Sequence, residues 1–125
     1  MTGIAGGVKK EPERQLGDVI VAEEIVGYEP SRITDGDVIR RFDVFRPAFD
    51  LISTAKKIKP ESWALSTHVK RPDGKTGRVI PNVHFGVVAS GEKVIADNDF
   101  VNDLQTSWSR LAAVEMEGYG AALAA

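Results

Sequence analysis

The segment 113–117 places the strongest constraint on the fold, because two carboxylates, Glu115 and Glu117, follow directly on the apolar pair Ala113 and Val114. The apolar residues predict a short buried strand. Burying an unpaired carboxylate costs several kcal/mol, so acids at such a strand end usually hold a partner side chain or a ligand. In a regular strand both side chains point to one side, and an acceptor-only carboxylate suits a vicinal diol. The alternative is structural, with an arginine or helix amides satisfying both acids.

Charge and composition exclude several classes of partner. The 125 residues include 16 basic and 18 acidic side chains, a formal net charge of −2, which argues against nucleic acid as the main partner. There is no cysteine, so a disulfide framework and a thiolate metal site are both excluded, in agreement with a cytoplasmic location. No apolar run approaches the roughly 20 residues of a membrane span, and the N-terminus lacks the order of a signal peptide. We expect one cytoplasmic domain over residues 1–125, with no membrane partner.

Strands are predicted from apolar and β-branched runs. Residues 19–29 form such a run, and residues 82–97 predict a strand that meets a turn at Ser90 and then continues. Residues 31–37 are predicted to be a loop by composition, and residues 71–77, which are rich in turn formers, are predicted to be an exposed loop or a hairpin end.

Helices are predicted from residue spacing. Residues 47–58 begin with a proline and end before Pro60, and they place Phe49, Ile52 and Ala55 at intervals of three. A second helix is expected to be capped by Asn98 or Asp99. Its apolar face is predicted to contain Phe100, Val101, Leu104, Trp108 and Leu111, and residues 118–125 are expected to begin a further helix.

Three smaller features have structural explanations that require no function. The glycines of residues 3–7 are typical of a tight turn, with a backbone-lined pocket wall as the functional alternative. His68 and His84 lack the spacing of paired metal ligands, so no metal site is expected. Trp63 and Trp108 fall within apolar patterns and are expected to be core or partner-facing aromatics.

Four segments, read together, carry a resemblance to a known family. They are GIAGGV, LGDVIVAEEIVGYE, HFGVVASGEKVIAD and AVEMEGYGAA, and they occur in the order found in the nucleoside phosphorylase and nucleosidase superfamily. The chain is most similar to the branch that contains 5'-methylthioadenosine/S-adenosylhomocysteine nucleosidase. The resemblance implies an α/β fold, with a mixed twisted sheet flanked by helices in a partial phosphorylase/hydrolase-like arrangement. It also implies a pocket at strand ends for an adenosine-type purine nucleoside, a homo-oligomer, and no cofactor.

The resemblance assigns roles to particular residues. Glu117 matches the glutamate that holds the ribose 2'- and 3'-hydroxyls, and Met116 matches the methionine packed against the sugar. Glu115 matches a pocket acid near the ribose and the nucleophile, which makes it the candidate catalytic residue. The other matched substrate-binding positions are Val94 and Ile95 at the base and Gly3, Ala5 and Gly6 in the glycine turn beside the ribose.

The chain also departs from the family pattern. The family's general acid is an aspartate on a strand after the helix that follows VEMEG, and its water-activating acid lies on strands before the glycine turn. The chain is therefore expected to be a central portion of a nucleosidase. Ile4 stands where phosphorylases tend to have serine, which favours hydrolysis of the N-glycosidic bond over phosphorolysis. The alternatives are a catalytically inactive module that binds nucleosides or associates with itself, or a gene fragment with no independent role.

Overall fold

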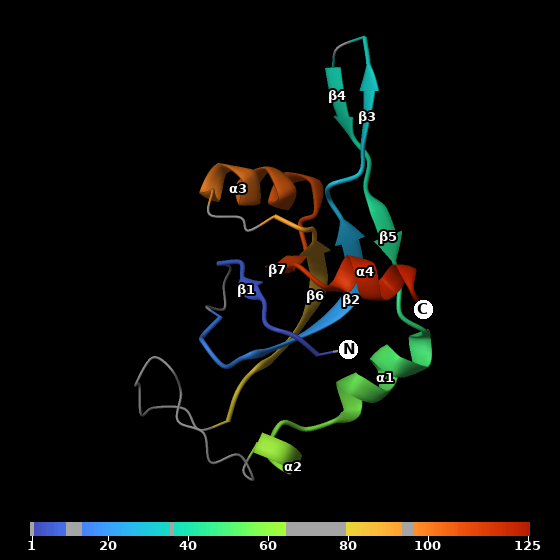
Figure 1. The fold of residues 1–125 in the computed structure, drawn as a ribbon. Helices are drawn as coiled ribbons and strands as arrows, with labels where there is room; N and C mark the ends of the chain where they lie inside the picture. Colours follow the sequence, from blue (N-terminus) through green and yellow to red (C-terminus); the bar gives the residue numbers. More distant parts are fainter. Residues whose placement is uncertain (1, 10–13, 36, 65–79, 94–96) are drawn as a thin grey trace.

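A mixed five-stranded sheet forms the centre of the computed structural model, which describes residues 2–9, 14–35, 37–64, 80–93 and 97–125 (Figure 1). The strand order is β1-β7-β6-β2-β5, in which β2, β6 and β7 run parallel and the two edge strands run antiparallel to their neighbours. This arrangement confirms the expected α/β fold. The strands are β1 (Gly6–Gly7), β2 (Val19–Gly27), β5 (Asp43–Phe45), β6 (Val83–Ser90) and β7 (Leu111–Glu115).

The parallel strands occupy the centre of the sheet, and in β2 and β6 the buried residues lie toward the carboxyl ends. Val26, Ala89 and Ala113 are each at most 1% exposed. The strand predicted over 19–29 is confirmed, although β2 ends at Gly27. The predicted turn at Ser90 is the end of β6, and residues 94–96, where the strand was expected to continue, lie outside the described part.

Helix α3 (Asn98–Ser107) packs against the sheet through Leu104, which is fully buried. Its cap is Asp97, whose side chain accepts a hydrogen bond from the Asp99 N–H at 2.9 Å, so the prediction of Asn98 or Asp99 as the cap was wrong. The predicted helical face was also too long, because Leu111 belongs to β7. Leu111 is nevertheless buried in the same core cluster as Leu104, so helical spacing continued by coincidence into the next strand.

Residues 31–37 were predicted to be a loop, and that prediction was wrong. Strands β3 (Ser31–Thr34) and β4 (Asp37–Arg40) pair as an antiparallel hairpin that projects away from the central sheet (Figure 1). Asp35 lies at the turn with a φ of 52°. Because backbone pairing with a single neighbour requires no apolar alternation, a polar, turn-rich sequence can form such strands.

Helix α1 (Phe49–Lys57) confirms the helix predicted over 47–58, and the short α2 (Glu61–Ala64) follows it. The predicted apolar face is not buried as a whole, since Phe49 is 83% exposed while Ile52 and Ala55 are half-buried. The loop predicted over 71–77 lies outside the described residues. Within the described part of the chain, no helix has both the length and the apolar character needed to cross a membrane.

Candidate functional site

The carboxyl ends of three parallel strands meet in register at one edge of the sheet. Gly27 of β2 lies opposite Ser90 of β6, and Ser90 lies opposite Glu115 of β7. Ligands in open α/β sheets commonly bind outside the carboxyl ends of parallel strands. This edge of the sheet is therefore the candidate location of a ligand site.

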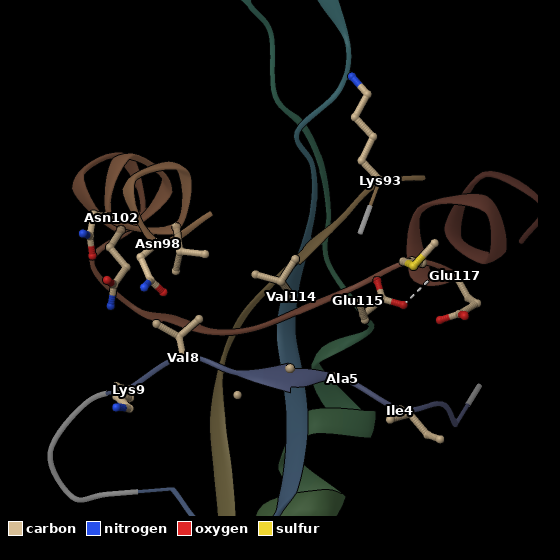
Figure 2. Close-up of a pocket in the computed structure, with 15 residues that line it drawn as sticks. Ile4, Ala5, Val8, Lys9, Lys93, Asn98, Asn102, Val114, Glu115 and Glu117 are labelled. Atoms are coloured by element: carbon tan, nitrogen blue, oxygen red, sulfur yellow. Dashed lines mark hydrogen bonds between the residues drawn. The ribbon is translucent and has the colours of Figure 1, made fainter. Parts of the chain in front are cut away.

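A cavity of about 840 Å³ lies beside this edge (Figure 2). Its walls are the glycine segment 4–9, the end of β7 with residues 114–117, Lys93, and one face of α3. The segment 3–7, predicted to be a tight glycine turn, is instead extended and includes β1, so that prediction was wrong. The fold brings this glycine segment to the glutamate pair, because β1 pairs with β7 and sets Gly6 opposite Val114.

Most of the described residues that the resemblance assigned lie together in this cavity. Ala5, Gly6, Glu115, Met116 and Glu117 all line it. Gly3 does not line it but lies close by, because a Cβ at this position would lie 3.8 Å from Glu117 Oε2. Val94 and Ile95, the predicted base contacts, lie outside the described residues.

Glu115 caps the helix that follows it, α4 (Gly118–Leu123). Its Oε2 accepts hydrogen bonds from the backbone N–H groups of Glu117 and Gly118, both at 2.8 Å. Its Oε1 is buried without a hydrogen-bond partner among the described residues. Helix amides therefore satisfy one oxygen of Glu115, as the structural alternative anticipated, and leave the other uncommitted.

Glu117 is placed differently, because β7 ends at Glu115 and does not reach it. Glu117 lies at the N-cap of α4 with φ −114° and ψ −24°, so the expectation that both acids share one strand was wrong. In the part of the chain that the structure describes, its carboxylate accepts no hydrogen bond, and the residue is exposed. Met116 is 44% exposed, and both residues also line a second cavity of about 430 Å³ beside Gly27 and Tyr119.

Two site residues, Ser90 and Tyr119, were not identified from the sequence. Ser90 is fully buried, and its Oγ accepts a hydrogen bond from the Tyr119 N–H at 2.7 Å. The N–H groups of residues 117, 118 and 119 are thus all bound by side chains from β6 and β7. In the sequence, Ser90 is a serine at the end of an apolar run, and this pattern does not differ from that of an ordinary turn residue.

Tyr119 fastens α4 to the sheet. Its hydroxyl donates a hydrogen bond to Asp43 Oδ2 at 2.8 Å, and this bond, with a smaller contribution from burial, raises the pKa of the phenol. The ring lies directly on Gly27, where a Cβ would come within 2.4 Å of ring carbons. A side chain at residue 27 would therefore displace α4, and with it Met116 and Glu117.

Tyr28 supports the segment that leaves β6. Its hydroxyl donates a hydrogen bond to the Lys93 carbonyl at 3.1 Å, and the residue is 3% exposed. Burial, together with the charges of Glu29 and Glu115, raises the pKa of this phenol. Tyr28 thereby fixes the backbone at Lys93, on the wall of the larger cavity.

The histidine inside the described part lies away from this cavity. His84 Nε2 is 3.0 Å from Asp18 Oδ2 near the amino ends of β2 and β6, and His68 lies outside the described residues. Among the residues that the structure describes, no three His, Asp or Glu side chains are grouped as metal ligands.

Comparison with known proteins places the chain in a family. No curated protein matched it. Among solved structures, it is similar to a 5'-methylthioadenosine/S-adenosylhomocysteine nucleosidase from Colwellia psychrerythraea 34H in complex with adenine, at 22% identity and a TM-score of 0.64. That match covers 98% of this chain and 45% of the nucleosidase, so the chain spans less than half of that enzyme's length, and the likeness concerns the fold. The phosphorylase superfamily matches residues 1–125, and the chain belongs to that superfamily.

Proposed function

We propose that residues 1–125 form a domain with the ribose and base contacts of a purine nucleoside site, in an enzyme that cleaves the N-glycosidic bond. The observation that carries this proposal is the state of Glu117. Its carboxylate is exposed, accepts no hydrogen bond from the described residues, and lies beside the glycine segment 3–7 at the larger cavity. Such a carboxylate can accept one hydrogen bond from each hydroxyl of a ribose.

The chemistry assigned to the neighbouring residues follows from charge. Cleavage of a glycosidic bond develops positive charge on the sugar, and a nearby carboxylate stabilises that charge. Glu115 contributes such a carboxylate, with Oε2 held by helix amides and Oε1 uncommitted. The resemblance places the acid that protonates the departing purine on a strand following α4. Binding of the nucleoside is the property that we assign to these 125 residues.

Hydrolysis is favoured over phosphorolysis for two reasons. Ile4 stands where phosphorylases of the family tend to have serine, and it is 94% exposed. The first amides of α4, which at a free helix N-terminus could bind an anion, are bound by Glu115 and Ser90.

Calorimetric titration with adenosine tests the proposal. Hydrogen bonds to a charged group contribute about 1.5–3 kcal/mol each, so Glu117→Ala should weaken adenosine binding by about tenfold or more. Glu61→Ala is the control, because Glu61 is an exposed acid on α2 away from the cavity. Unchanged affinity in Glu117→Ala would contradict the ribose assignment. Adenine released in the same samples would show that the chain also cleaves the bond.

A second candidate function, self-association, is favoured by the apolar surface of α1. Phe49 is 83% exposed and Leu51 is 65% exposed. The two residues are two positions apart and so lie on different faces of α1, and each offers an exposed apolar side chain to a second copy of the chain. Sedimentation velocity should show concentration-dependent association that the double variant Phe49→Ser/Leu51→Ser reduces. A wild-type chain that stays monomeric over the whole concentration range counts against this candidate.

A further inference from the structure

Tyr28 is a buried residue that reaches the larger cavity only through other residues. It directly follows β2, is 3% exposed, and is not among the described residues that line the larger cavity. Its backbone N–H donates a hydrogen bond to the Ser90 carbonyl at 3.3 Å. This bond anchors Tyr28 at the carboxyl end of β6, where the chain leaves the sheet.

The Tyr28 side chain holds the segment that leaves β6 at two points. A Cβ at Gly91 would lie 2.4 Å from the ring Cζ, so the ring approaches this closely because residue 91 is glycine. Two residues further on, the hydroxyl donates a hydrogen bond to the Lys93 carbonyl at 3.1 Å. The Gly91 N–H also donates to the Glu115 carbonyl at 3.2 Å. Contacts with Tyr28 and with the last residue of β7 thus fix the backbone of residues 91–93 together.

The Tyr28 ring also packs against α3. The rings of Tyr28 and Phe100 meet edge-on, with centroids 5.5 Å apart and an interplanar angle of 68°. An edge-to-face arrangement is one of the favoured geometries of an aromatic pair. The guanidinium of Arg40, on β4, lies over the same Phe100 ring at 4.8 Å from its centroid. Tyr28 therefore joins the segment 91–93 to the first turn of α3.

Both segments that Tyr28 joins contribute to the wall of the larger cavity. Lys93 lines this cavity, and so do Val101 and three amide side chains of α3. Lys93 is exposed, so water can replace the Tyr28 hydroxyl as the partner of its carbonyl. Loss of the hydroxyl should therefore loosen the wall of the cavity more than it destabilises the fold.

We infer that Tyr28 is a positioning residue of the nucleoside site, which holds Lys93 and α3 where the ligand contacts them. A wall that is already ordered lowers the entropic cost of ordering it when the ligand binds. This inference rests on the proposed function, because it takes the larger cavity to be the nucleoside site. It assigns a role to a residue for which the family resemblance gave none.

Calorimetric titration with adenosine at neutral pH tests the inference in Tyr28→Phe, which keeps the ring and removes the hydroxyl. We expect the affinity to fall about threefold to tenfold, the effect of one ordinary hydrogen bond. Glu23→Gln is the matched control, because Glu23 lies on β2, is not among the described residues that line the larger cavity, and binds Lys56 and Arg110. This control should lower the stability of the fold and leave the adenosine affinity unchanged.

The pH profile of binding is a readout that a merely structural role would not change. An ionised phenol cannot donate to the Lys93 carbonyl. Burial, together with the charges of Glu29 and Glu115, raises the pKa of the Tyr28 phenol above its ordinary value of 10.0. As the pH rises through the raised pKa, the ratio of wild-type to Tyr28→Phe affinity should fall toward one. The lysines of the cavity are present in both proteins, so their effect on binding cancels in the ratio.

Each outcome separates this inference from the proposed function. Unchanged adenosine affinity in Tyr28→Phe overturns the inference, and so does an equal loss in Glu23→Gln, because lowered stability would then explain both. An affinity ratio that stays constant through the Tyr28 titration, with circular dichroism showing both proteins folded, also overturns it. If Glu117→Ala weakens binding in any of these cases, the ribose site stands without the inference. Failure of the wild-type chain to bind adenosine removes both.

Discussion

Glu115 and Glu117 are two residues apart, and yet their carboxylates have different roles. Glu115 is the last residue of β7 and binds the amides of the next helix, whereas Glu117 lies beyond the strand with its carboxylate exposed. Gly118 makes this arrangement possible, because a Cβ there would lie 2.6 Å from Glu115 Oε1. At this scale, one acid is chiefly a cap and the other is the candidate ligand-binding group.

The two tyrosines provide a prediction about single residues. The chain contains only Tyr28 and Tyr119, and the pKa of each is raised above its ordinary value of 10.0, by burial for Tyr28 and by the hydrogen bond to Asp43 for Tyr119. A raised folded-state pKa contributes stability that is complete below the unfolded pKa and is lost as the pH rises through the folded value. Tyrosinate absorbance should therefore develop at higher pH in the folded chain than in urea. Coincident titration curves would contradict this.

The N-terminal end of α4 is held in place by contacts with residues of four strands. Ser90 of β6 and Glu115 of β7 bind its first amides, while Tyr119 rests on Gly27 of β2 and donates to Asp43 of β5. Because Met116 and Glu117 directly precede this helix, the same contacts position the candidate ribose-binding residues.

Substitution of Ser90 tests this element. In Ser90→Ala the partly buried Tyr119 N–H loses the acceptor that the buried Ser90 provides, which should lower the free energy of unfolding by about 1–3 kcal/mol. Ser62→Ala is the control, because Ser62 is exposed on α2 and its substitution should change stability by less than about 0.5 kcal/mol. Urea unfolding measures both. Equal effects of the two substitutions would show that the Ser90 contact does not stabilise α4.

At the scale of the whole molecule, Glu23 joins segments that are far apart in the sequence. Its carboxylate accepts a hydrogen bond from Arg110, and one of its oxygens lies 2.7 Å from Lys56 Nζ on α1. The bond to Lys56 is the main cause of a pKa below the ordinary 4.5, with Arg110 contributing and burial opposing. One partly exposed carboxylate on β2 thus holds both α1 and the segment before β7.

The lowered pKa of Glu23 sets an expected pH dependence. A depressed folded-state pKa contributes stability that is present above the unfolded value of 4.5 and is lost as the pH falls through the folded value. Glu23→Gln should therefore be less stable than the wild type at neutral pH, and the difference should shrink below pH 4.5. Urea unfolding midpoints across this range measure it. A difference that stays constant with pH would exclude the ion pairs as its cause.

Local patterns in the sequence were sufficient to identify several elements. The strand at 19–27 and the helices α1, α3 and α4 follow from apolar runs and helical spacing, which depend on neighbours along the chain. The cluster at 115–117 and the glycine segment 3–7 were likewise recognisable as contiguous motifs, but the tight turn predicted for the glycines is an extended segment that includes β1. The hairpin β3–β4 was not, since pairing between polar strands leaves no periodic signal.

The sequence by itself determined that two acids follow a buried strand, that a glycine-rich segment lies near the start of the chain, and that these motifs resemble one family. Only the tertiary structure decided which of the two carboxylates binds the backbone amides of α4. The difference arises because β7 ends at Glu115, so the helix amides and Ser90 meet there through the register between β6 and β7. Register pairs residues of segments that are distant in the sequence, so the pattern along β7 alone does not show that Ser90 of β6 lies opposite Glu115.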